Sequence, residues 1–148
     1  MKWVTRERPR IDRVACAWLI RRFIDEAPEF LFVPNDQVFE VAEREGAHIF
    51  HVRGGKFERT ADETGFEALI RHFELGSDDP ALQQLAAIVH GADVRTADAP
   101  PESAGVRSIM MGYVDVYADD HELTRVATTV YESLYQWLRR QHAARRST

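Results

Sequence analysis

One amphipathic segment, residues 11–25 (IDRVACAWLIRRFID), lies between two short apolar segments, and this order most constrains the fold. The apolar residues of the segment recur with helical spacing, which predicts a helix with one buried face. Residues 2–6 alternate in polarity and residues 29–34 (EFLFVP) are mostly apolar, so both are predicted strands. A strand, a helix and a strand in this order favour a right-handed βαβ unit.

The rest of the chain is predicted to be mainly helical. After the βαβ unit we expect a short helix over residues 37–44, a third strand over 47–52, and an extended segment over 56–60. Four further helices are expected over about residues 62–75, 80–89, 102–117 and 120–141, with a frayed tail after about residue 142. The predicted fold is α+β in one domain over residues 1–148. A small, mainly N-terminal sheet of three or four strands is covered on one side by helices.

Composition excludes several classes of protein. A chain of 148 residues is long enough for one hydrophobic core. The single cysteine, Cys16, cannot form an internal disulfide. The longest apolar run, residues 14–20, is too short to span a membrane, and residues 1–10 lack a signal-peptide pattern. We therefore expect a cytoplasmic protein without a membrane segment.

Charge is distributed unevenly along the chain. The formal net charge is −5, which argues against a nucleic-acid partner. Yet six arginines fall within the first 22 residues: Arg6, Arg8, Arg10, Arg13, Arg21 and Arg22. Guanidinium groups form forked bonds to oxyanions, so Asp12 and Arg13 at a helix start mark a candidate anion site, with help from Arg21 or Arg6. A GC-rich genome would also produce an excess of arginine.

Common catalytic and cofactor motifs are missing. The sequence has six histidines but no HExxH, CxxC, GxSxG, P-loop or GxGxxG motif, so it carries no nucleotide or flavin motif. His90 and Asp93 lie three residues apart on a predicted helix, a spacing that places both on one face and suits a transition metal. His90 could equally pair near the end of its helix. Glu67 is another candidate ligand, although an ion pair with Arg71 would also explain it.

Four residues are weaker candidates. Cys16 could be a redox-active thiol near a helix N-terminus, but a buried, inert cysteine is the commoner outcome. His48 and His51 differ in parity on a predicted strand, so a flat strand would let only one of them face a bound ion. His121 lies in a first helical turn, where it could simply be solvated.

These segments together resemble the chromate resistance protein family. The resemblance is carried by KWVTRERPRIDRVACAWLIRRFID and EFLFVP, and continues through FEALIRHFEL, DDPALQQLAAIVHGADV, PESAGV and DDHEL…VYESLYQWL. It covers about residues 2–138, and the stretch from Asp12 to Asp25 is its most specific part. The same domain is found as the C-terminal half of chromate-responsive transcriptional regulators.

The sequence departs from the family pattern in three respects. The regulators have an N-terminal winged-helix-like part, whereas here the motif begins at residue 2, so no direct DNA binding is expected. The family's Cys-Thr-Phe-Glu-like run corresponds to residues 63–67 (ETGFE), which lack a thiol, so a two-thiol mechanism is in doubt. Its His-Asp-x-Asp run corresponds to residues 90–93 (HGAD), which lack one carboxylate.

The resemblance implies a shared site in a cleft between the sheet and the helices. Its metal ligands would be Glu67, His90 and Asp93. Asp12 and Arg13 also fall on positions of the family pattern and would bind the anion, and our own hypothesis adds Arg21 as a further anion-binding residue. The cofactor would be a divalent transition metal ion, Zn, Fe or Mn, and the other ligand a small anion.

The leading functional hypothesis is a metal- or oxyanion-binding protein that acts in sensing or detoxifying chromate or metal stress. One alternative is a metal- or thiol-dependent oxidoreductase with Cys16 as electron donor. Another is a non-catalytic effector module that docks on a regulator or transporter through its last helix, or that forms a homodimer. Whether the protein is an enzyme is left open by the sequence.

Overall fold

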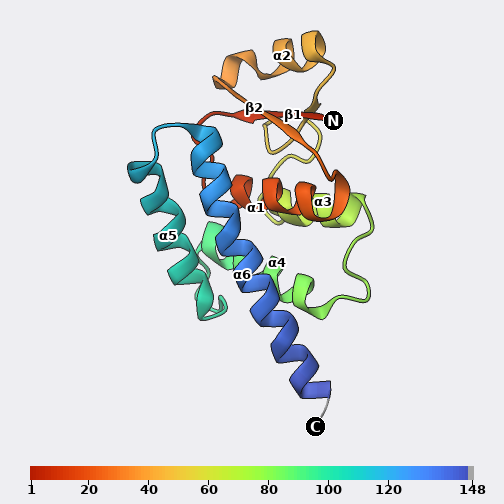
Figure 1. The fold of residues 1–148 in the computed structure, drawn as a ribbon, viewed down its shortest axis with the longest axis vertical. Helices are drawn as coiled ribbons and strands as arrows, with labels where there is room; N and C mark the ends of the chain where they lie inside the picture. The colour runs from red at the N-terminus through yellow and green to blue at the C-terminus, as the bar shows by residue number, and fades with distance from the viewer. Residues whose placement is uncertain (147–148) are drawn as a thin grey trace.

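The computed structural model describes residues 1–146, which form a small sheet and six α-helices (Figure 1). The strands are β1 (Lys2–Arg6), β2 (Glu29–Val33) and β3 (His48–Ile49). The helices are α1 (Ile11–Leu19), α2 (Val38–Glu45), α3 (Gly65–His72), α4 (Pro80–Val94), α5 (Glu102–Val116) and α6 (Asp120–Arg146). A π-helical turn, Ile20–Ile24, continues α1, and a 3₁₀ turn, Asn35–Gln37, precedes α2. The α+β fold class is confirmed.

The sheet has the order β2-β1-β3, and both neighbours of β1 run parallel to it. The strand–helix–strand prediction is therefore confirmed. The predicted third strand is shorter than expected, and residues 56–60 form no strand. The cause is backbone geometry, because His51 and Phe57 have left-handed φ angles of 52° and 60° that turn the chain away from the sheet. The N–H of His51 donates to the carbonyl of Phe57 instead of to a strand.

Helices cover both faces of the sheet, so the expectation of a one-sided helical layer is wrong. Successive side chains of a strand point to opposite faces. On one face Trp3 and Phe30 join the main core with α1. On the other face Val4 packs with Val38 and Val41 of α2 in a separate small cluster. Figure 1 shows α2 and α1 on opposite sides of the strands.

Helix α1 lies at the centre of the helical half, with α3, α4, α5 and α6 all packed against it. The longest helix, α6, crosses it and anchors to its first turn, where the buried Tyr131 hydroxyl donates to the carbonyl of Ile11 at 2.8 Å. Helix α6 reaches Arg146, so the predicted end near Gln141 is corrected. Fraying of the tail stays a prediction. No helix within residues 1–146 combines the length and apolar character needed to cross a membrane.

The loop between β1 and α1 is fixed from two sides. From its inner side, Arg13 donates to the carbonyls of Arg6, Glu7 and Arg8 at 3.0–3.2 Å. From its outer side, the Arg8 guanidinium donates to the carbonyls of Val114, Tyr117 and Ala118 and to the Asp120 carboxylate. Arg8 thereby ties this loop to the junction of α5 and α6.

Removal of the Arg8 side chain should destabilise the fold. We expect Arg8→Ala to lower the free energy of unfolding by roughly 1–3 kcal/mol, because several charge-assisted hydrogen bonds are lost together. Urea denaturation measures the change. Arg10→Ala in the same loop is the control, since the Arg10 side chain is exposed and its loss should change stability by less than about 0.5 kcal/mol. Equal stability of the two variants would contradict the role given to Arg8.

Candidate functional site: an arginine-lined cleft

A cleft opens where β1 and β3 end and α1 begins. Its volume is about 250 Å³, and it is lined by five arginines: Arg6, Arg10, Arg13, Arg59 and Arg107. Two carboxylates, Asp12 and Asp93, also line it, together with His51, Ile11 and Met111. We call this feature the arginine cleft. The carboxyl edge of a parallel sheet is a common place for a binding site, because loops and helix N-termini meet there.

Asp12 forms the floor of the arginine cleft and is only 2% exposed. Its carboxylate accepts hydrogen bonds from the N–H groups of Gly65 and Phe66, at 2.7 and 3.0 Å, at the start of α3. Burial raises the pKa of Asp12, but His51 and the two N–H groups lower it by more, so the pKa lies below its ordinary value. Asp12 is therefore an internal anion bound at a helix N-terminus. It is held by the protein's own groups.

His51 lies beside Asp12, with its Nε2 atom 2.7 Å from Asp12 Oδ2. The two atoms form no hydrogen bond of standard geometry, and Nε2 has no other hydrogen-bond partner among the described residues. The left-handed backbone of His51 turns its ring into the cleft. Gly65 makes room for it, because a Cβ atom there would lie 2.7 Å from His51 Cδ2.

Asp93 is held by Arg59, which donates from Nε to Asp93 Oδ2. This hydrogen bond raises the pKa of Arg59. Arg107 is fixed on the same side, because its Nη1 donates to the carbonyl of Ala92 near the end of α4. Both carboxylates of the arginine cleft therefore already have partners.

Four arginines of the cleft, Arg6, Arg10, Arg13 and Arg107, carry a positive charge that neither of its carboxylates pairs. Burial, together with the nearby guanidinium groups of Arg6 and Arg10, lowers the pKa of Arg13 to about 10. The Arg13 side chain binds only backbone carbonyls. Within residues 1–146 the side chains of Arg6 and Arg10 form neither a hydrogen bond nor an ion pair. Like charges held close together in this way are typical of a site that binds an anion.

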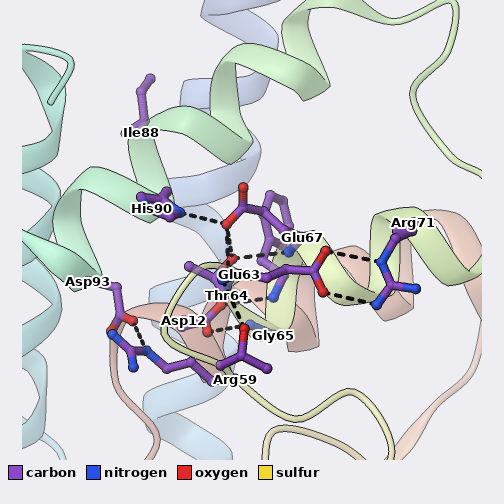
Figure 2. Close-up of polar contacts among 12 residues, drawn as sticks. Asp12, Arg59, Glu63, Thr64, Gly65, Glu67, Arg71, Ile88, His90 and Asp93 are labelled. Atoms are coloured by element: carbon purple, nitrogen blue, oxygen red, sulfur yellow. Dashed lines mark hydrogen bonds and ion pairs between the residues drawn. The ribbon is translucent and has the colours of Figure 1, made fainter. Parts of the chain in front are cut away.

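The predicted metal ligands are only partly brought together. Figure 2 shows His90 beside Glu67, with His90 Nδ1 2.7 Å from Glu67 Oε1. Glu67 also completes a capping box with Thr64, whose N–H and hydroxyl both donate to the same Oε1 atom. The alternative ion pair of Glu67 with Arg71 does not form, since Arg71 binds Glu63.

Asp93 points to Arg59, away from the Glu67–His90 pair (Figure 2). Across residues 1–146, no three histidine, cysteine, aspartate or glutamate side chains are grouped so that they could hold a metal ion. The residues as arranged here therefore do not fit a structural or catalytic metal, which needs at least three protein ligands. The metal assignment stays a prediction.

The other predicted residues lie in different surroundings. Cys16 is completely buried, and burial and the nearby Asp12 carboxylate raise its pKa, which does not favour a thiolate donor. Arg21 lies outside the arginine cleft, with its guanidinium over the Phe30 ring. His121 is exposed and its ring contacts Phe32.

Sequence reasoning missed two members of the arginine cleft, Arg59 and Arg107. They come from an irregular loop and from α5, and no local motif marks either of them. The excess of arginine over lysine is the one sequence signal that includes both. The sequence analysis noted Arg10 only as part of a cluster of arginines, and His51 only as a residue of a predicted strand.

The fold and the cleft together define an α+β domain with a cationic site at the carboxyl edge of its sheet. Comparison with known proteins identifies the family of this domain. The chain belongs to the ChrB C-terminal domain family, which it matches over residues 3–138. It is 33% identical over 134 residues to Protein ChrB of Cupriavidus metallidurans, with 90% of this chain covered. The chain spans 40% of the length of that relative. No solved structure matches it.

The pairing of Asp12 predicts a pH-dependent stability. A lowered pKa in the folded state stabilises the fold above the ordinary aspartate pKa of about 4, and this stabilisation is lost as the pH falls through the folded value. We expect Asp12→Asn to be less stable than the parent chain by roughly 1–3 kcal/mol at pH 7, with a smaller difference at pH 3. Urea denaturation at both pH values measures this.

Asp36→Asn is the matched control, because Asp36 is exposed and should show no such difference. A stability difference for Asp12→Asn that stays constant between pH 7 and pH 3 would show that the charge of Asp12 does not matter.

The metal assignment is tested by elemental analysis. From the geometry we expect protein from medium supplemented with Zn, Fe and Mn to hold less than about 0.2 metal ion per chain, because only two donors are grouped. His90→Ala serves as the control. Stoichiometric metal in the parent chain that disappears in His90→Ala would instead establish the predicted site.

Proposed function

We propose that this domain binds a small tetrahedral oxyanion in the arginine cleft, and that chromate is its ligand in a chromate stress response. The observation that carries the proposal is the unpaired positive charge of Arg6 and Arg10 beside the buried Arg13. Guanidinium groups match the oxygen atoms of an oxyanion through paired N–H donors. Family membership supplies the chromate context.

The backbone adds to this positive site. The first turn of α1 lines the arginine cleft, and the N-cap residue of α1, Arg10, makes no side-chain capping bond. The first N–H groups of a helix have no partner within it, and together they favour an anion. Asp12 and Asp93 do not cancel the attraction, because α3 and Arg59 hold them.

The same geometry disfavours the alternatives. A cation would meet five guanidinium groups in the arginine cleft. An electron-donating role for Cys16 would require exposure that its complete burial denies. Helix α6 buries Leu123, Ala127, Tyr131 and Leu138 of its apolar stripe within the fold, and Trp137 is the one large apolar side chain of this helix that is exposed among the described residues, at 42%. A sensor only has to bind its anion, and the arginine cleft can do this without a metal ion or a reactive thiol.

The proposal predicts saturable chromate binding that depends on the arginine cleft. We expect Arg10→Ala to weaken binding roughly 10- to 100-fold, which corresponds to the loss of one or two charge-assisted hydrogen bonds. Equilibrium dialysis, with chromate detected by its absorbance, measures the dissociation constant. Sulfate and molybdate should compete, and binding should weaken as ionic strength rises.

Arg140→Ala is the matched control, since Arg140 is an exposed arginine on α6 and does not line the arginine cleft. It should bind chromate within about 2-fold of the parent chain. Equal binding by the parent chain and Arg10→Ala, or no saturable binding at all, would refute the proposal.

A further inference from the structure

A second, larger pocket adjoins the arginine cleft between the end of α4 and the start of α5. Its volume is about 660 Å³. Arg107 and Met111 line both it and the arginine cleft, so the two cavities meet at these side chains. We call it the α4–α5 pocket. Its size lies within the range of roughly 300–1,000 Å³ typical of pockets for small organic molecules, and exceeds what an inorganic oxyanion needs.

The lining of the α4–α5 pocket differs in chemistry from the arginine cleft. Its surface is more apolar than polar, with Pro100, Ala104 and Met111 among the apolar lining residues, and Thr96 and Ser108 add hydroxyl groups. Its charged residues are Arg95 and Arg107, and no carboxylate lines it among the described residues. A mainly apolar pocket with a few polar groups beside a cationic cleft suits a molecule with one anionic end.

The pocket is bounded by tightly packed parts of the fold. Gly91 lets the start of α5 approach α4, since a Cβ atom there would lie 2.5 Å from Ser103 Oγ. The buried Ser103 hydroxyl donates to the carbonyl of Ile88 at 2.8 Å and joins the two helices. Arg107 is held at the boundary by its bond to Ala92. The wall between the two helices is therefore formed before any ligand binds.

We propose that the arginine cleft and the α4–α5 pocket together bind an organic anion. Its phosphate, sulfonate or carboxylate group would lie on Arg107 and the neighbouring arginines of the cleft, and its compact apolar body would fill the α4–α5 pocket. The inference rests on the proposed oxyanion site and extends the ligand class of that site to organic molecules. Arg107 lines both cavities. The bond between the anionic group and the apolar body of the ligand would therefore lie beside Arg107.

Two probes that share one anionic group test the proposal. Inorganic phosphate engages only the arginine cleft, whereas 1-naphthyl phosphate adds an apolar body. Isothermal titration calorimetry should give at least about 10-fold tighter binding of 1-naphthyl phosphate by the parent chain, since added apolar contact in a preformed pocket strengthens binding. Neutral 1-naphthol should bind far more weakly, because it cannot use the arginines.

Variants separate the two cavities. Ala104→Phe places a ring in the α4–α5 pocket from an exposed position on α5, and should remove the advantage of 1-naphthyl phosphate while leaving phosphate binding within about 2-fold. Ser108→Phe is a second blocking variant at another exposed position of the same helix. Arg10→Ala should weaken both probes.

The outcomes distinguish this inference from the proposed function. If chromate and phosphate bind but 1-naphthyl phosphate gains nothing, or if its advantage survives in both blocking variants, the organic anion is ruled out and the oxyanion site stands. If neither chromate nor either phosphate binds, both proposals fail.

Discussion

The carboxylate of Asp12 is the interaction on which the functional half of this structure depends. It lies on α1, is almost completely buried, and binds the first N–H groups of α3. A carboxylate without partners would be costly to bury, so α1 and α3 are stable together only in the arrangement that satisfies it. That arrangement also brings His51 against Gly65, and thereby closes one side of the arginine cleft.

A second consequence concerns charge. Because Asp12 binds the start of α3 and Asp93 binds Arg59, neither carboxylate cancels the charge of Arg6 at the end of β1, Arg10 in the loop that follows, or Arg13 on α1. The same loop is held by Arg13 from within and by Arg8 from the α5–α6 side. Cationic side chains on a rigid loop lose little conformational entropy when an anion binds, which favours affinity. Rigidity and unpaired charge thus arise from the same set of contacts.

The sequence predicts most of the fold, because long amphipathic segments and the strand–helix–strand order depend on local periodicity. It does not predict that α2 packs on the second face of the sheet, or that the left-handed backbone at His51 shortens β3. The sequence grouped Glu67, His90 and Asp93 as ligands of one metal ion, whereas in the structure Glu67 and His90 bind each other and Asp93 binds Arg59, a residue 34 positions distant in the chain. Ion pairs between residues far apart in the chain cannot be predicted from the spacing of residues in the sequence. The place of Arg107 in the arginine cleft could not be predicted from spacing either.

The position of the arginines within an acidic protein affects how a ligand reaches them. The chain has a net charge of −5, so an approaching anion is repelled overall at long range. At physiological ionic strength such fields decay over about 8 Å, and only the field of the cleft itself acts on an ion at its mouth. Electrostatic steering from a distance therefore contributes little to the rate of capture. Selectivity for an anion is determined locally, after diffusion has already delivered it to the sheet edge.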